Sequence, residues 1–255
     1  MVKADFVRIG GLPVIRADAE QLGAIMARDV AAARKGELSL PRVVTSANGN
    51  VVALYHMSPA FRRMIDACDI VDCDGMAIAL ASRWLTRTPL PERVATTDWL
   101  LTAARVAQGE GLRFYFLGGR PGVALRAAEH LVSRFPDLSI AGTRHGYFDM
   151  SDLPRICEEI RAAGTDVLWV GLGNPLQEEF ALKAREMLPG VGWIRTCGGL
   201  FDHYGGGVSR APLWMQNSGL EWAYRAAREP LRLGLRYLIT NPIAVYHLLV
   251  HTGNE

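Results

Sequence analysis

The stretch VLWVGLGNP at residues 167–175 decides the fold class of this chain. Its first four residues form an apolar run typical of a buried strand, the glycines interrupt that run, and helical spacing begins after Pro175. The same order of strand, glycine-rich turn and helix recurs at residues 114–122 (FYFLGGRPG), and residues 70–75 (IVDCDG) place a carboxylate at a strand end. Buried strands that alternate with helices predict an α/β fold with a mainly parallel sheet.

This alternation extends outward over most of the 255 residues. The chain opens with a predicted hairpin, strands 6–9 and 12–15, that turns at Gly10-Gly11, and Asp18 then caps a helix over 19–35. Further strands are expected at 42–45, 70–74, 113–117, 139–143, 166–171 and 192–196. Helices are expected at 51–57, 61–68, 76–85, 98–108, 123–135, 153–163 and 176–188. The pattern predicts a Rossmann-like sheet flanked by helices.

The composition changes once, after about Arg210. From there the chain has helical spacing and is rich in aromatic and arginine residues: Trp214, Trp222, Tyr224, Tyr237, Tyr246, Arg225, Arg228, Arg232 and Arg236. No internal repeat and no low-complexity linker divides the chain. We therefore predict an α/β core over residues 1–209 and a helical C-terminal appendage over residues 210–255.

Composition and charge exclude several classes of protein. A hydrophobic fraction of 49% argues against disorder. A net charge of +2 is too small for a nucleic-acid binder unless the positive charge is concentrated on one face. The four cysteines form no C-x-x-C pair, which argues against a structural zinc site and a disulfide framework and favours a reducing cytoplasm.

The N-terminus lacks the pattern of a secretory signal. Residues 231–250 are apolar, but Arg232, Arg236 and an interruption expected at Asn241-Pro242 make them a poor bilayer-spanning helix that could still lie on a membrane.

Polar and glycine residues gather where the predicted strands end. They are Asn48, Asp74, Gly118-Gly119, Gly171, Gly173-Asn174-Pro175 and Cys197-Gly198-Gly199. In a parallel sheet these ends meet at one edge, where the following helices direct free N–H groups at a ligand. The pattern therefore predicts one ligand site built from five loops.

Two of these turns suit a phosphate. Gly118-Gly119 lets the backbone approach an anion, with Pro121 expected as the first helical residue. The turn is not G-x-G-x-x-G, so a dinucleotide cofactor is not favoured. Asn174-Pro175 is expected to form a cap and a first helical turn, which places Gln177 where it can either reach a ligand or be solvated.

Asp74 is the candidate general base, since a partly desolvated carboxylate at a strand end can accept a proton from a hydroxyl group. Asp72 lies two residues earlier on the same strand face but deeper. It is either a structural residue or an N-cap partner.

A set of segments, in order and at matching separations, resembles the WecG/TagA/CpsF glycosyltransferases (glycosyltransferase family 26). These segments are Ser46-Ala47-Asn48, Asp72-Cys73-Asp74-Gly75, Pro91-Glu92-Arg93-Val94, residues 116–123 (FLGGRPGV), His145-Gly146-Tyr147-Phe148, residues 171–178 (GLGNPLQE), residues 198–202 (GGLFD), Arg210-Ala211-Pro212 and residues 219–225 (GLEWAYR). The resemblance covers most of the chain.

The resemblance implies metal-independent, inverting transfer of a sugar from a UDP-sugar to a polyprenyl-diphosphate-linked acceptor at the cytoplasmic face of a bacterial membrane, in exopolysaccharide or cell-surface glycan synthesis. It assigns Asp74 as the base. It assigns substrate binding to Ser46, Asn48, Arg93 and Gln177, with Ser46 in place of the usual threonine. The glycine-rich turns are then the UDP site: Gly118, Gly119, Gly171, Gly173, Asn174, Gly198 and Gly199.

The departing diphosphate needs compensation of its charge, and without a metal this falls to helix N-termini and arginines. Arg210, Arg225 and Arg228 are the candidates, and solvated helix-face charges are the alternative for each.

The aromatic tail suits a membrane interface, with a packing helix or a homo-oligomer contact as the alternative. Two other functions stay open: a nucleotide-dependent oxidoreductase, and a non-catalytic nucleotide-sugar-binding partner of a polysaccharide pathway. The donor could be N-acetylmannosamine, its uronic acid or glucose.

Overall fold

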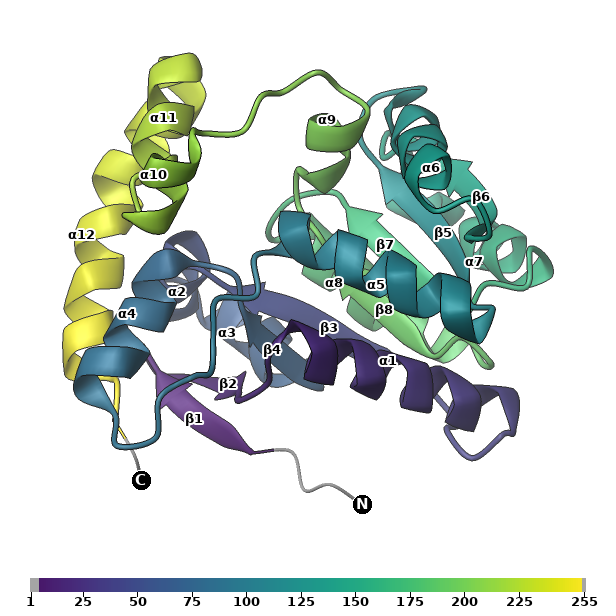
Figure 1. The fold of residues 1–255 in the computed structure, drawn as a ribbon, viewed down its shortest axis with the longest axis horizontal. Coiled ribbons are helices and arrows are strands. Elements are labelled where there is room, and N and C mark those ends of the chain that lie inside the picture. The colour runs from purple at the N-terminus through teal and green to yellow at the C-terminus, as the bar shows by residue number, and fades with distance from the viewer. Residues whose placement is uncertain (1–4, 254–255) are drawn as a thin grey trace.

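A computed structural model of the chain describes residues 5–253, apart from the side chains of Asn217 and Arg232. Its centre is a six-stranded sheet in which every neighbouring pair is parallel (Figure 1). The strands follow the order β4 (Ile70–Cys73), β3 (Arg42–Ala47), β8 (Trp193–Thr196), β7 (Val167–Gly171), β5 (Arg113–Gly118) and β6 (Ser139–Arg144). A separate antiparallel hairpin joins β1 (Phe6–Ile9) and β2 (Leu12–Ile15). The predicted α/β class and the predicted hairpin are both confirmed.

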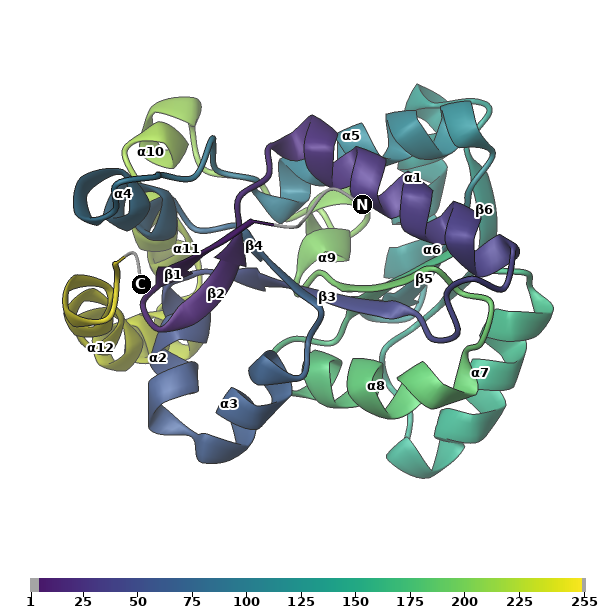
Figure 2. The same cartoon turned by 90° about the horizontal axis from the view of Figure 1, so that it is seen from below.

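Helices cover both faces of this sheet (Figure 2). One face carries α1 (Ala19–Arg34), α5 (Thr96–Glu110) and α6 (Val123–Arg134), and the other carries α3 (Pro59–Asp66), α7 (Leu153–Ala162) and α8 (Leu176–Ala184). The remaining helices of the core are α2 (Gly49–Met57), α4 (Met76–Leu85), α9 (Leu200–Tyr204) and the 3₁₀ turns η1 (Met150–Asp152) and η2 (Arg185–Met187).

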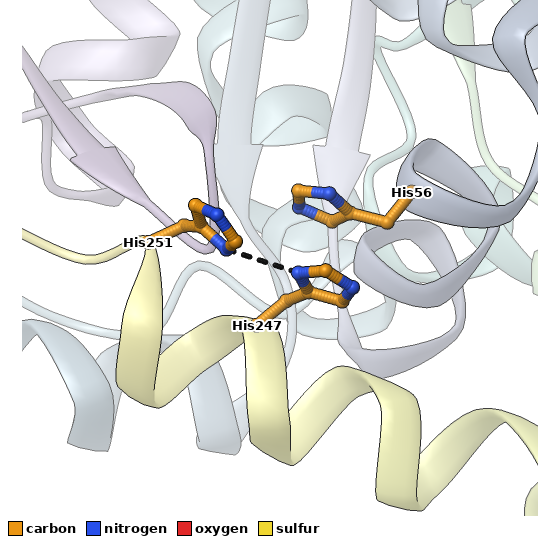
Figure 3. A group of neighbouring side chains, drawn as sticks. All are labelled: His56, His247 and His251. Carbon is orange, nitrogen blue, oxygen red and sulfur yellow. Dashed lines mark hydrogen bonds between the residues drawn. The ribbon is translucent and has the colours of Figure 1, made fainter.

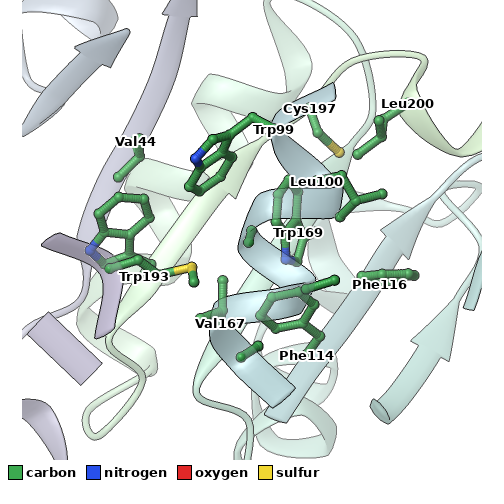
Figure 4. Close-up of a cluster of buried hydrophobic side chains, with 14 of the residues drawn as sticks. Val44, Trp99, Leu100, Phe114, Phe116, Val167, Trp169, Trp193, Cys197 and Leu200 are labelled. Atoms are coloured by element: carbon green, nitrogen blue, oxygen red, sulfur yellow. The ribbon is translucent and has the colours of Figure 1, made fainter. Parts of the chain in front are cut away.

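The central strands are buried on both faces because their alternate side chains enter two different cores. Phe114, Phe116 and Trp169 pack with Trp99 of α5 and Trp193 of β8 in the larger core (Figure 4). The residues between them on β5 and β7 face α7 and α8 in the opposite core. A run of consecutive apolar residues is therefore the expected sequence of such strands.

A buried carboxylate links neighbouring elements at the edge of the sheet where the strands begin. Asp166 precedes β7 and is 1% exposed. It accepts hydrogen bonds from Arg34 Nε at 3.0 Å, from Arg34 Nη2 at 2.7 Å and from the backbone N–H of Arg113 at 2.8 Å. Burial alone would raise the pKa of Asp166, but the hydrogen bonds from both arginines outweigh it and hold the pKa below its usual range.

The chain after residue 210 forms α10 (Leu213–Asn217), α11 (Glu221–Arg228), a π-helical turn, η3 (Pro230–Gly234), and α12 (Leu235–Val250). Helix α12 lies along α2, and Ala244 and Leu248 enter a third core with the hairpin and α4. The interruption expected at Asn241-Pro242 is wrong, because α12 runs through Pro242. One proline costs one helix hydrogen bond, and packing along α2 outweighs that loss. Within the described part of the chain, no helix combines the length and apolar character needed to cross a bilayer.

Candidate functional site

A cavity of about 990 Å³ opens at the carboxyl edge of the sheet. Loops after β3, β4, β5, β7 and β8 line it on the core side, and helices α11 and α12 line it on the other. The predicted convergence of five loops at one edge is confirmed. The predicted site residues that line it are Ser46, Asn48, Asp74, Arg93, Gly119, Gly171, Gly173, Asn174, Gln177, Gly198, Gly199 and Arg225.

Asp74 follows the last residue of β4 and is half-buried at the cavity wall. Its Oδ1 accepts a hydrogen bond from the backbone N–H of Thr96 at 2.8 Å, at the N-terminus of α5. Its Oδ2 accepts one from Asn48 Nδ2 at 3.2 Å, and its main-chain carbonyl accepts one from Arg93 Nε at 2.6 Å. The carboxylate is thus oriented from both sides, and each oxygen keeps a lone pair for another partner.

Asn48 has two roles in this arrangement. It is the N-cap of α2, and its Oδ1 accepts a hydrogen bond from the backbone N–H of Val51 at 3.1 Å. Its amide nitrogen is therefore fixed on the side that faces Asp74. This side chain joins the loops after β3 and β4, beside the backbone hydrogen bonds that the N–H groups of Asp74 and Gly75 donate to the carbonyl of Ala47.

A buried ion pair lies beneath Asp74. Arg195 of β8 and Asp72 of β4 are 0% and 1% exposed, with 2.6 Å between Arg195 Nη2 and Asp72 Oδ2. The same Arg195 nitrogen donates to Ser46 Oγ at 2.8 Å and to Thr96 Oγ1 at 3.3 Å. Burial raises the pKa of Asp72 to about 6, against the opposing influence of Arg195. Asp72 is therefore structural, one of the two roles left open for it, and it does not line the cavity.

Arg195 is a positioning residue that the sequence analysis missed. It holds Ser46 and Thr96, and the Thr96 backbone N–H holds Asp74. A signal was available, because an arginine inside a strand with apolar neighbours on a central sheet requires a buried anionic partner.

Gln177 joins two of the glycine-rich loops. It is 5% exposed, its Oε1 accepts a hydrogen bond from the backbone N–H of Gly198 at 2.8 Å, and its Nε2 donates to Glu178 Oε1 at 2.9 Å. The alternative that Gln177 is solvated is therefore wrong. Asn174 Nδ2 donates to the same Glu178 oxygen at 2.7 Å, so Asn174 does not cap α8, whose N-cap is Pro175. Burial raises the pKa of Glu178.

The loop after β5 differs from its prediction in two ways. Helix α6 begins at Val123 with Gly122 as its N-cap, so Pro121 is not its first residue. Gly118 packs against the backbone of Gly171 and does not line the cavity, whereas Gly119 does. The backbone N–H of Gly119 donates to the carbonyl of Gly171 at 3.3 Å. This amide is thus partly occupied by the neighbouring strand.

The structure separates the three candidate arginines of the appendage. Arg225 lines the cavity. Arg210 instead pairs with Asp98 of α5, and Arg228 donates to Ser209 and lies 5.5 Å from the ring centroid of Tyr224. Neither Arg210 nor Arg228 lines the cavity, so they are not brought together with Asp74.

Two further features connect charged residues of the appendage with the cavity. Arg236 of α12, not singled out from the sequence as a site residue, does line the cavity. Arg93 Nη2 donates to Glu221 Oε2 of α11 at 3.0 Å, with both side chains largely buried. This ion pair attaches the appendage to the loop that orients Asp74.

The appendage exposes several large apolar side chains. Large exposed side chains gather on α10, the π-helical turn and α12: Leu213, Trp214, Leu231, Leu235, Leu238 and Ile239. A second cavity of about 470 Å³ lies among α11, the π-helical turn and α12, and its walls are almost wholly apolar. An exposed apolar surface of this kind is typical of an interaction site.

Comparison with known proteins identifies a family and individual relatives of this chain. The model of the glycosyl transferase WecG/TagA/CpsF family matches residues 7–254. An N-acetylglucosaminyldiphosphoundecaprenol N-acetyl-β-D-mannosaminyltransferase of Bacillus spizizenii (strain W23) is 29% identical over 208 residues, which are 82% of this chain and 79% of that protein. The protein of the same name from Bacillus subtilis (strain 168) is 30% identical over 190 residues, 74% of this chain and 73% of that protein. This chain therefore belongs to the WecG/TagA/CpsF family of glycosyl transferases.

Proposed function

We propose that the protein is an inverting glycosyltransferase that moves a sugar from a UDP-sugar to a polyprenyl-diphosphate-linked acceptor in bacterial exopolysaccharide or cell-surface glycan synthesis. The observation that carries this proposal is Asp74, a half-buried carboxylate held at the wall of a large cavity by Thr96 and Asn48. The names of the two Bacillus relatives support an undecaprenyl-diphosphate-linked acceptor and an N-acetylmannosamine-type donor sugar. The uronic acid of that sugar and glucose are the alternative donors.

In the proposed reaction Asp74 acts as general base. It takes the proton of an acceptor hydroxyl group as that oxygen forms a bond to the anomeric carbon from the face opposite UDP. The bond from the anomeric carbon to the β-phosphate oxygen breaks, and its electron pair leaves with UDP. The anomeric configuration is inverted because attack and departure occur on opposite faces.

The UDP group is assigned to the glycine-rich loops, Gly119, Gly171, Gly173, Asn174, Gly198 and Gly199, beside Gln177. The charge that develops on the diphosphate is then met by Arg225 and Arg236, which face the cavity from the appendage. Asp72 is engaged by Arg195, so Asp72-Cys73-Asp74 does not present two carboxylates to the cavity. This arrangement supports metal-independent transfer.

We further propose that the protein works at the inner face of the cell membrane, with the exposed apolar side chains of the appendage against the lipid. Leu231 and Leu238 are 84% and 74% exposed. Replacing both with serine should reduce sedimentation with anionic liposomes, while Leu125→Ser, an exposed apolar residue of α6, should not. Unchanged liposome binding with a smaller oligomer would instead assign this surface to a contact between two copies of the chain.

The transfer is tested by UDP release from a panel of UDP-sugars, with a short-chain polyprenyl-diphosphate glycan acceptor and EDTA present. We expect acceptor-dependent turnover that falls by roughly 10²–10⁴ in kcat in Asp74→Asn, the usual range for losing a general base. Asp137 is an exposed aspartate that does not line the cavity. Asp137→Asn is therefore the matched control and should leave turnover unchanged.

Two results would contradict the proposal. Turnover that stops when EDTA is added would refute metal independence. UDP binding without turnover for any donor and acceptor in the panel, in a folded protein, would favour the non-catalytic binding partner.

A further inference from the structure

Three histidines from two distant segments of the chain, one from α2 and two from the end of α12, come together (Figure 3). His247 and His251 lie one turn apart near the end of α12, and His56 lies in the last turn of α2. The rings of His56 and His247 stack with 3.5 Å between their centroids, and one nitrogen from each of the three rings lies within 4.8 Å of the others. None of the three lines the cavity that contains Asp74.

The hydrogen bonds fix where lone pairs are available. His56 Nε2 lies 2.8 Å from the carbonyl oxygen of Gly10, and because a carbonyl only accepts, this nitrogen carries the proton. His56 Nδ1 therefore holds a lone pair, which accepts from Arg62 Nη2 at 3.2 Å. Between His247 Nδ1 and His251 Nδ1, 2.9 Å apart, one nitrogen donates and the other accepts.

The hydrogen bonds of His56 suit a metal ligand. Its Nε2 donates to the Gly10 carbonyl and its Nδ1 accepts from Arg62, which is the pattern of a neutral imidazole. Neutral imidazoles are the form that binds metal ions. The Gly10 carbonyl on His56 is also the kind of partner that orients the second nitrogen of a metal-ligating histidine.

We propose that His56, His247 and His251 form a binding site for one divalent transition-metal ion of the class that prefers imidazole, such as Zn²⁺. Nitrogens on a tetrahedral Zn²⁺ at about 2.0–2.1 Å lie roughly 3.4 Å apart, so the rings need to tilt and close by up to about 1.4 Å from their present spacing. His247 Nδ1 and His251 Nδ1, 2.9 Å apart, are already closer than this and would move slightly apart. Binding through His56 Nδ1 would keep the Gly10 contact, displace Arg62 and replace the hydrogen bond between His247 and His251. The His56 ring, which lies parallel to that of His247, would have to tilt toward the ion.

Such an ion would join α2 to the end of α12, beside the N-terminal hairpin. Around the cluster, the backbone N–H of Gly11 donates to the carbonyl of His251 at 2.8 Å, and the backbone N–H of Gly10 donates to Thr252 Oγ1 at 2.9 Å. Helix α12 continues from this point to the cavity, where it contributes Arg236. A metal ion held by α2 and α12 would therefore stabilise the docked position of the appendage.

The experiment uses the tag-free full chain, stripped with EDTA and then dialysed. Co²⁺ is titrated and followed by its visible d–d absorption, and Zn²⁺ is titrated by calorimetry. We expect one saturable site per chain, with affinity reduced by roughly tenfold or more in His247→Gln and in His251→Gln. His130→Gln, an exposed histidine of α6, is the matched control and should bind as the unmodified chain does.

A thermal scan provides a second measurement, because an ion that binds only the folded chain raises its Tm. Zn²⁺ should raise the Tm of the unmodified chain and of His130→Gln but not of His247→Gln. Absence of a one-to-one site, or equal affinity in all variants, would overturn the proposal and leave ring stacking as the role of the cluster. Neither measurement requires sugar transfer.

Discussion

The carboxyl ends of β5 and β7 are packed so closely that one added methyl group should push the two strands apart. A Cβ built on Gly118 lies 2.4 Å from the carbonyl oxygen of Gly171 and 2.7 Å from its carbonyl carbon, and the φ of Gly118 is +153°. The atoms it meets belong to the backbone of a paired central strand. Gly118→Ala can therefore be accommodated only if the two strand ends move apart.

The cost follows from two contributions. Overpacking of a dense interior costs about 1–3 kcal/mol, and a positive φ in a residue with a side chain adds about 1 kcal/mol, so the free energy of unfolding should fall by about 2–4 kcal/mol. For a chain of this size that corresponds to a decrease of roughly 4–16 °C in Tm. The loss should be seen in urea unfolding followed by far-ultraviolet circular dichroism.

Gly173→Ala separates the two contributions. Gly173 has a φ of +78°, but a Cβ built there has no heavy atom within 4 Å. This variant should lose only the backbone contribution, about 1 kcal/mol. An equal loss in both variants would refute the argument that backbone contact limits position 118.

Three other predictions follow from the described contacts. Asp166→Asn should lower the free energy of unfolding by about 1–2 kcal/mol at pH 7, a value reduced because the arginine partners are partly exposed. Since the folded-state pKa of Asp166 is depressed, its contribution is present above about pH 4 and is lost as the pH falls through that pKa, so urea unfolding at pH 3 should show a smaller difference from the unmodified chain. Asn48→Ala should cost about 1 kcal/mol through loss of the α2 cap and should also lower kcat by releasing Asp74; unchanged kcat would contradict its positioning role. Arg225→Ala should raise the KM for the UDP-sugar roughly tenfold or more, whereas Arg228→Ala, outside the cavity, should not; equal effects would contradict the division between these arginines.

Much of the fold is determined by the sequence alone. The hairpin and the strands at residues 70–73 and 167–171 were predicted within a residue or two, because burial on both faces of a parallel sheet requires a continuous apolar run. The convergence of Asn48, Asp74 and the glycine-rich turns also followed, since the carboxyl ends of parallel strands share one edge. The roles of these residues and the division at residue 210 stay predictions.

The tertiary structure decided which polar side chains are partners. Arg195 and Asp72 are separated by more than a hundred positions, and no local period indicates that they meet. No local period indicates the contact of Gln177 with Gly198, the placement of Arg225 rather than Arg228 at the cavity, or the meeting of His56 with His247 and His251 either. Periodicity reports which face of an element is buried, whereas the identity of a partner depends on strand order and on how distant elements pack. In this protein the sequence therefore determined the elements and the edge that holds the site, and packing determined how the site is held.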